Sequence, residues 1–132
     1  MVTLDDLQGA PALLVFMPLA FTRVCGGEMC EIRDNLEALA DTGAQTVAIT
    51  CDNVPVNAAW AEKEGFGFPI LSDFWPHGET TRAYGCFNDK LGVPHRFTFV
   101  LDEEGIVRDV ISTDSLGEAR KVRSYVDALS GL

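Results

Sequence analysis

The sequence predicts an α/β fold in which a central mixed β-sheet is flanked by helices. Short, continuous apolar runs recur along the chain, and such runs are typical of buried strands. Segments with apolar residues at helical spacing lie between these runs. Near the C-terminus, two β-rich runs flank a short turn. The 132 residues are enough for one compact domain, covering residues 1–132, and not for two.

Three apolar runs predict the buried strands of the sheet. Each run is short, continuous and too brief for a typical helix. Strands of this kind are buried on both faces, so they favour a sheet that is covered on both sides. The predicted strands are residues 10–17 (APALLVFM), 45–50 (QTVAIT) and 68–73 (FPILSD).

Four helices are predicted from apolar spacing and from helix start and stop signals. In the first helix Gly43 is placed as a stop, and in the second Gly65 has the same role. Pro55 stands near the start of the second helix, where proline is tolerated. The last helix is amphipathic. The predicted helices are residues 30–43, 54–65, 78–85 and 116–132.

A hairpin is predicted over residues 96–113, RFTFVLDEEGIVRDVIST. Gly105 can supply the positive φ that a tight turn needs. The complete order is β-α-β-α-β-α-β-β-α, and the hairpin makes the sheet mixed. This order matches the thioredoxin-like fold with one extra helix inserted before the hairpin.

The charge of the chain argues against two classes of partner. Twenty acidic and ten basic residues give a formal charge of −10, which disfavours nucleic acid and anionic membrane surfaces. The longest apolar run is too short to span a membrane and has no basic flank, so we expect a cytoplasmic protein. In a reducing compartment, its four cysteines are expected to be free or reactive rather than a disulfide framework.

The stretch FMPLAFTRVC places Cys25 where the first strand gives way to a helix. Free amides and the helix dipole favour an anion at this position, and the thiolate is the reactive form of cysteine. Thr22 stands three residues earlier, so its hydroxyl can reach the sulfur or an oxygen bound to it. Pro18 fixes the backbone at the strand end. Plain structural roles remain open: Thr22 as a helix cap, Pro18 as a strand terminator and Cys25 as a buried residue.

PLAFTRVC resembles the peroxiredoxin motif, in which proline, threonine and cysteine stand at the spacing of Pro18, Thr22 and Cys25. The stretches GGEMCEIRDNL, FPILSDFWPHG, AYGCFN and RFTFVLDEEGIVR follow in family order. The wording of PLAFT and LSDFWPHG is most similar to the one-cysteine AhpE-type branch. The resemblance covers nearly the whole chain. Peroxiredoxins usually carry a further N-terminal segment, and we expect this chain to lack it.

The resemblance implies a thiol-dependent peroxidase with Cys25 as the peroxidatic cysteine. Its thiolate would attack a hydroperoxide and become a sulfenic acid. Thr22 would hold the peroxide, and the Cys25 amide would add a donor. Arg96 would match the family's active-site arginine, stabilising charge on the leaving oxygen. Glu28 would anchor that arginine, although it also suits the acidic preference of a helix N-terminus.

The resemblance also implies the partners of the protein. Substrates would be hydrogen peroxide and organic hydroperoxides. The reductant would be thioredoxin, a mycoredoxin-type protein or a low-molecular-weight thiol, and the chain would form a homodimer. No cofactor is expected. No metal is expected either, because His77 and His95 are not at ligand spacing with the cysteines.

Cys30 follows Cys25 by five residues, a spacing that resembles the Q-type (bacterioferritin-comigratory) peroxiredoxins, where it holds the resolving cysteine. Positions i and i+5 of a helix lie ~7.5 Å apart along its axis and on different sides. A disulfide needs Cα atoms within ~7 Å, so the helix would have to unwind first. Gly26 and Gly27 weaken that turn. The alternative is that Cys30 is a packing residue.

The remaining cysteines and large aromatic residues have weaker assignments. Cys51 and Cys86 are predicted to be packed apolar residues, with a resolving role as the alternative if the fold brings one near Cys25. Phe21, Phe74 and Trp75 are predicted to build pocket walls or core, with a dimer interface as the alternative.

Two other functions compete with a peroxidase. A thioredoxin-like thiol-disulfide oxidoreductase shares the fold, but it normally separates its cysteines by two residues, whereas four separate Cys25 from Cys30. A thioredoxin also has proline directly before the threonine of a late strand, where this chain has Phe97. The second competitor is a non-catalytic peroxiredoxin-like binding domain, supported only by the short N-terminus.

Overall fold

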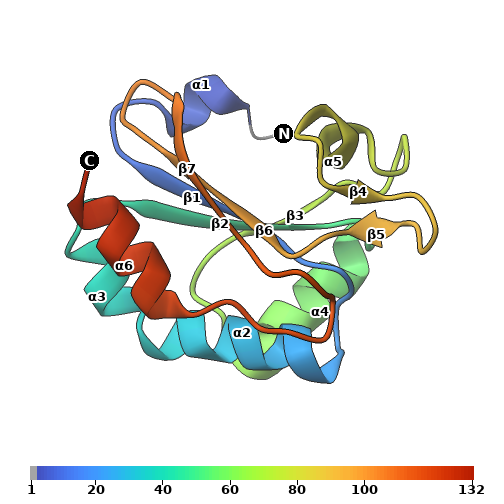
Figure 1. The fold of residues 1–132 in the computed structure, drawn as a ribbon. Helices are drawn as coiled ribbons and strands as arrows, with labels where there is room; N and C mark the ends of the chain where they lie inside the picture. Colours follow the sequence, from blue (N-terminus) through green and yellow to red (C-terminus); the bar gives the residue numbers. More distant parts are fainter. Residues whose placement is uncertain (1–2) are drawn as a thin grey trace.

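The structure is a computed structural model that describes residues 3–132, apart from the side chain of Leu4. A five-stranded sheet with the order β3-β2-β1-β6-β7 forms its centre (Figure 1). β2 runs parallel to β1 and β3, whereas β6 is antiparallel to β1 and β7, so the predicted mixed sheet is confirmed. The strands are β1 (Ala12–Phe16), β2 (Gln45–Thr50), β3 (Ile70–Ser72), β6 (Phe97–Leu101) and β7 (Val107–Ser112).

Helices lie on both sides of this sheet (Figure 1). One side carries α2 (Arg23–Asp34), α3 (Leu36–Ala40), α4 (Val54–Glu64) and α6 (Val122–Ser130). The other side carries the short helices α1 (Leu4–Leu7) and α5 (Glu79–Ala83). A small separate ladder joins β4 (Phe87–Asn88) to β5 (Val93–Pro94). Neither α1 nor this ladder was predicted, because both are too short to produce a periodic pattern.

Two hydrophobic clusters are separated by the sheet. Side chains alternate along a strand, so Leu13, Val15 and Met17 of the first strand segment join the cluster under α2, α4 and α6. Leu14 and Phe16 belong to the opposite cluster. Cys25 is part of the first cluster and Cys86 of the second, with the remaining core residues divided in the same way.

The first predicted helix is longer at its start and interrupted in its middle. It begins at Arg23 rather than at Cys30, because Thr22 has extended backbone and occupies the N-cap position. It is divided at Asn35, whose side-chain amide donates to the Glu31 carbonyl at 2.8 Å. An asparagine that bonds locally to the backbone competes with helix continuation.

The last helix begins at Val122 instead of residue 116. Residues ahead of it are held by tertiary contacts: the Leu116 carbonyl accepts from Arg96, and the Arg120 amide donates to Glu28. The Glu31 carboxylate then accepts from the Val122 amide at 3.0 Å and caps the helix. The strand predicted as buried over residues 68–73 is instead β3, a half-buried edge strand of three residues, and the helix predicted over residues 78–85 is shortened to α5. Two predicted glycine roles are confirmed. Gly65 ends α4 in a left-handed conformation, and Gly105 has a φ of 82° in the predicted hairpin.

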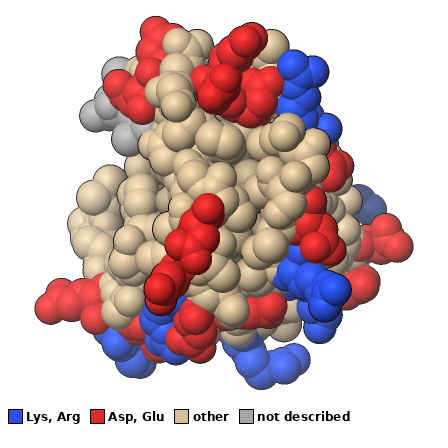
Figure 2. Space-filling view, turned by 90° about the vertical axis from the view of Figure 1, so that its left-hand side faces the viewer, with Lys and Arg blue, Asp and Glu red and all other residues tan. Residues whose placement is uncertain are grey.

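On the face drawn in Figure 2, acidic residues are spread out rather than gathered at one end. Figure 2 shows one face on which Asp and Glu side chains lie among large uncharged areas and a few basic residues. From residue 3 to the C-terminus, no helix has the length and apolar character needed to cross a bilayer.

Candidate active site

Pro18, Thr22, Cys25 and Arg96 all line one pocket of about 450 Å³. The pocket lies where β1 ends and α2 begins, close to the start of β6. Apolar side chains make up much of its remaining wall, namely Leu19, Val24, Leu91, Val93 and Leu116. Leu91 is 64% exposed, so this wall offers apolar surface to a bound molecule.

Cys25 is the third residue of α2, and its side chain is almost fully buried. The N–H groups of a helix's first turn have no intrahelical partner. Within residues 3–132, no hydrogen bond occupies the Cys25 amide. The thiol and this free amide therefore belong to the same end of the helix, where the dipole favours an anion.

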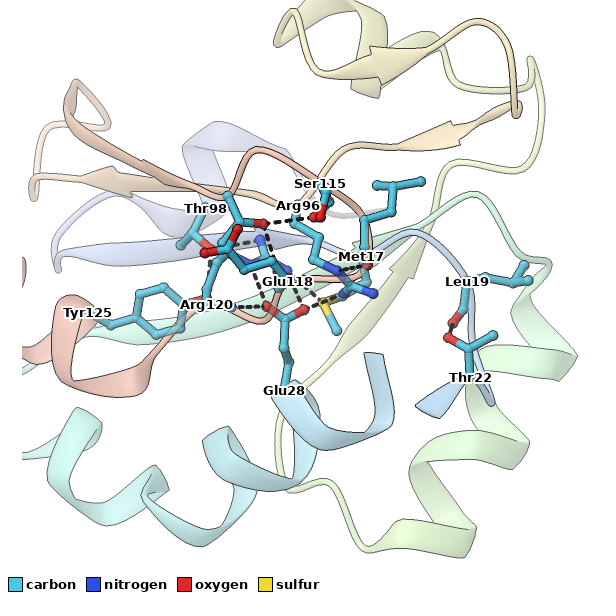
Figure 3. A network of polar contacts seen from close by, with 12 residues as sticks. Met17, Leu19, Thr22, Glu28, Arg96, Thr98, Ser115, Glu118, Arg120 and Tyr125 are labelled. Atoms are coloured by element: carbon cyan, nitrogen blue, oxygen red, sulfur yellow. Dashed lines mark hydrogen bonds and ion pairs between the residues drawn. The ribbon is translucent and has the colours of Figure 1, made fainter. Parts of the chain in front are cut away.

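Thr22 is the N-cap residue by backbone position, but its side chain does not cap the helix. Its hydroxyl donates to the Leu19 carbonyl at 2.7 Å, as Figure 3 shows. A hydroxyl that donates its proton still has lone pairs with which to accept. Thr22 can therefore accept a hydrogen bond from a ligand in the pocket.

Phe21 has a left-handed backbone with a φ of 63°. For a residue with a side chain this conformation costs roughly 1–2 kcal/mol. The ring packs 6.1 Å from that of the buried Trp60, and the Lys63 ammonium lies 5.9 Å from its centroid. Nearby, the Ala20 amide donates to the Asp52 carboxylate at 2.8 Å. These contacts fix the loop between β1 and α2.

Glu28 lies one turn after Cys25 and joins two buried arginines (Figure 3). Its Oε1 accepts from Arg96 Nη1 at 2.5 Å. Arg96 Nε donates to the Leu116 carbonyl at 2.6 Å. Across residues 3–132, Arg96 Nη2 makes no hydrogen bond, and Arg96 lines the pocket. One end of the guanidinium is thus available to a ligand.

Arg120 is the second arginine, and sequence reasoning missed it. Its backbone amide and Nε donate to Glu28 Oε2 at 2.6 and 2.8 Å. Its Nη1 donates to the Thr98 hydroxyl at 3.0 Å, which in turn donates to the Tyr125 hydroxyl. The only sequence signal was a basic residue just ahead of an amphipathic pattern, and such residues are usually on the surface.

The charges of this network favour an anion in the pocket. Burial alone would raise the pKa of Glu28, but hydrogen bonds and charge from Arg120, together with the charge of Arg96, hold it below its usual value. Glu28 is therefore an anion between two cations, which leaves one positive charge uncompensated. Because Arg96 lines the pocket, an anion bound there would balance this charge.

Cys30 lies in the same unbroken helix as Cys25 but faces α4. Its sulfur is 3.8 Å from the Glu64 carboxylate. Burial, together with the Glu64 and Asp34 charges, raises the pKa of the Cys30 thiol despite the nearby Arg33. An i, i+5 pair in an intact helix cannot meet disulfide geometry.

Cys51 and Cys86 are both buried and both contact Thr81. Burial raises the pKa of Cys51 to about 11 and that of Cys86 to about 12. Cys86 belongs to the cluster on the other side of the sheet from Cys25. Both residues are packed, as their sequence context predicted.

The prediction that Phe21, Phe74 and Trp75 form pocket walls or core is wrong. Phe21 and Phe74 are each 49% exposed, and Trp75 is 83% exposed. None of the three lines the pocket that contains Cys25.

For residues 3–132, no group of three His, Cys, Asp or Glu side chains is arranged to hold a metal.

Comparisons with known proteins match this chain to peroxiredoxins. The sequence profile of the AhpC/TSA family matches residues 1–110. Alkyl hydroperoxide reductase E of Mycobacterium tuberculosis is 44% identical over 133 residues, covering 100% of this chain and 86% of that protein. Thioredoxin peroxidase of Fasciola hepatica is 29% identical, covering 89% of this chain and 64% of the relative. The crystal structure of peroxidoxin BcpB from M. tuberculosis matches with a TM-score of 0.84 and 31% identity, covering 98% and 84% of the two chains.

Proposed function

Since the chain belongs to the AhpC/TSA family of peroxiredoxins and is a thiol-dependent peroxidase, we propose that Cys25 is its peroxidatic residue. The observation that carries this proposal is the convergence of Thr22, Cys25 and Arg96 on one pocket. No other cysteine lines that pocket, considering residues 3–132. The substrates are hydrogen peroxide and organic hydroperoxides.

The first chemical step oxidises the Cys25 sulfur. The thiolate attacks the terminal oxygen of the hydroperoxide, the O–O bond breaks, and that oxygen stays on sulfur as a sulfenic acid. The other oxygen leaves as hydroxide or alkoxide and takes up a proton to become water or an alcohol. Two electrons pass from sulfur to the peroxide, so no cofactor is needed.

Each neighbouring group has a distinct role in that step. Thr22 accepts the hydroperoxide O–H, because its own proton is bound to the Leu19 carbonyl. The free Cys25 amide and the unoccupied Nη2 of Arg96 donate to the peroxide oxygens, where negative charge develops. Glu28 and the Leu116 carbonyl hold the Arg96 guanidinium in place.

Cys30 is the proposed resolving residue. Its thiol attacks the sulfenic acid, a Cys25–Cys30 disulfide forms, and water leaves. This step requires the first turns of α2 to unwind, because the intact helix keeps the two residues apart. One dithiol protein, or two molecules of a monothiol, then restores both thiols and leaves as a disulfide. Thioredoxin, a mycoredoxin-type protein or a low-molecular-weight thiol would serve, and the relative named thioredoxin peroxidase supports the first of these.

We also propose an oligomeric state and a location for the protein. The exposed Phe74 and Trp75 would be covered in a homodimer, which analytical ultracentrifugation of the wild type and of Trp75→Arg would test. Four free cysteines are consistent with a reducing compartment, and we propose a cytoplasmic location.

The experiment that tests the function compares the wild type with Cys25→Ser. Peroxide consumption should be lost in Cys25→Ser and retained in Cys86→Ser, with circular dichroism confirming that both variants fold. Insulin reduction, measured in parallel, should stay at background for all three proteins. Peroxide turnover by Cys25→Ser with every tested hydroperoxide would reject the assignment.

A further inference from the structure

Among residues 3–132, Phe21 is the single non-glycine residue with a positive φ, and it directly precedes Thr22. We propose that this left-handed backbone is a positioning device for peroxide reduction. It holds the Thr22 hydroxyl on the Leu19 carbonyl and so leaves the Cys25 amide available to the substrate. The inference rests on the proposed function of the pocket and adds Phe21 to it as a positioning residue.

Residues 19–22 form the turn between β1 and α2. Phe21 is the third of these four residues, the position where a left-handed conformation brings the first and fourth residues together. Gly or Asn usually takes this position, because a side chain strains it. Here the first and fourth residues meet through the Thr22 hydroxyl, which lies 2.7 Å from the Leu19 carbonyl oxygen.

The contact has a consequence for the helix start. An N-cap threonine ordinarily accepts from the amide two or three residues later, and Cys25 is the third helical residue. Because the Thr22 side chain is turned toward Leu19, it makes no such bond. The Cys25 amide stays unoccupied, considering residues 3–132, and Thr22 presents its lone pairs to the pocket. If the turn relaxed, the hydroxyl would be free to accept from the Cys25 amide, which would occupy that amide and one of the two lone pairs of the hydroxyl.

The aromatic ring of Phe21 maintains the strained turn. It contacts the buried Trp60 of α4, with ring centroids 6.1 Å apart, and Lys63 lies over it. A variant with a Cβ but no ring keeps the strain and loses these contacts. A glycine variant loses both the contacts and the strain, so it can keep the turn. The Gly and Ala variants therefore form a matched pair that differs by one methyl group.

The test measures the rate of Cys25 oxidation by hydrogen peroxide in stopped flow. Phe21→Gly and Phe21→Asn should stay within about threefold of the wild type, whereas Phe21→Ala and Phe21→Val should be slower by roughly tenfold. Melting temperatures check that all four variants fold, and the Gly–Ala comparison suffices if Phe21→Val does not. Equal rates for Phe21→Gly and Phe21→Ala would overturn the inference.

A second measurement asks whether Phe21 acts through Thr22. In a Thr22→Val background, the hydroxyl that the turn positions is absent, so Phe21→Gly and Phe21→Ala should differ by less than about twofold. A tenfold difference that persists there would reject the route through Thr22. Peroxide turnover that survives in Cys25→Ser would reject the proposed function. If the wild type is active and Phe21→Gly and Phe21→Ala are oxidised at equal rates, only the role of Phe21 is rejected.

Discussion

The carboxylate of Glu28 and the guanidinium of Arg120 form a fully buried, two-point ion pair, with Oε2 2.8 Å from Nε and Oε1 3.0 Å from Nη2. The same carboxylate holds Arg96 at the pocket. Arg120 lines no part of the pocket, yet it binds the carboxylate that holds Arg96 there. The segment just before α6 therefore supports the chemistry proposed for the start of α2.

Removing Arg120 should destabilise the protein strongly. Breaking a buried ion pair by removing one partner costs roughly 3–5 kcal/mol, and the Thr98 hydroxyl also loses its donor. Arg120→Met should therefore lower the free energy of unfolding by about that amount, measured in urea. Arg123→Met is the matched control, because Arg123 is 91% exposed and its pairing with Asp127 is at 3.9 Å. A loss no larger than that of the control would contradict the structural role of Arg120.

Removing Arg96 should affect the reaction more than any surface arginine does. Loss of one preorganised donor slows a chemical step by roughly 10²-fold or more, so Arg96→Ala should oxidise that much more slowly in stopped flow. Arg108→Ala removes an arginine whose side chain is 55% exposed and serves as the control. Rates for Arg96→Ala within twofold of the wild type would remove Arg96 from the proposed site.

The Glu28 carboxylate should make stability depend on pH in the acid range. Its pKa is lowered from an ordinary value of 4.5, so its contribution is complete above that pH and is lost as pH falls through the lowered pKa. The difference in unfolding free energy between the wild type and Glu28→Gln should be largest near neutral pH and shrink below about pH 4.5. Urea titrations from pH 3 to pH 7 measure this difference. A difference in unfolding free energy that stays constant or grows toward acid pH would contradict a lowered pKa of Glu28.

Gly26 and Gly27 should control how fast the proposed disulfide forms. A Cβ at either position meets nothing within 4 Å, so alanine can be introduced without a clash. Each alanine should strengthen the helix by about 1 kcal/mol, so the double variant should form the Cys25–Cys30 bond roughly tenfold or more slowly.

The measurement for this prediction is mass spectrometry of peroxide-treated protein quenched at successive times. Sulfenic acid should persist longer in the double glycine variant, while Cys30→Ser should form no Cys25–Cys30 linkage at all. Gly131→Ala adds the same methyl group at the end of α6, where the nearest atom is at 3.6 Å, and should leave the kinetics unchanged. An unchanged disulfide rate in the double variant would argue that unwinding of this turn does not limit the step.

Cys51 and Cys86 should resist alkylation in the folded protein. With pKa values of about 11 and about 12, their thiolate fractions at pH 8 are about 10⁻³ and 10⁻⁴. Iodoacetamide at pH 8 should leave both unlabelled in buffer and label both in urea, as read by peptide mass spectrometry. Rapid labelling of either cysteine in buffer would contradict the burial that raises their pKa values.

The sequence by itself determined the strands of the central sheet, its hairpin and the thiol at the start of α2. These features depend on short spacings: apolar runs of a few residues, Gly105 in a turn, and Pro18, Thr22 and Cys25 within one loop. Local patterns of this kind fix local backbone, because the groups that interact are neighbours along the chain.

The family resemblance, and no pattern along the chain, suggested that Glu28 anchors Arg96, and only the tertiary structure brought Arg120 to the same carboxylate. Glu28 meets Arg96 across 68 residues and Arg120 across 92, and no periodicity connects positions so far apart. The same contacts moved the start of the last helix to Val122, because Arg120 is bound to Glu28 and its segment cannot also join a helix. The sequence also did not predict the left-handed turn at Phe21, because the ring of Phe21 packs on Trp60, which lies in α4. Propensity along the chain is a weak preference, and buried long-range contacts override it.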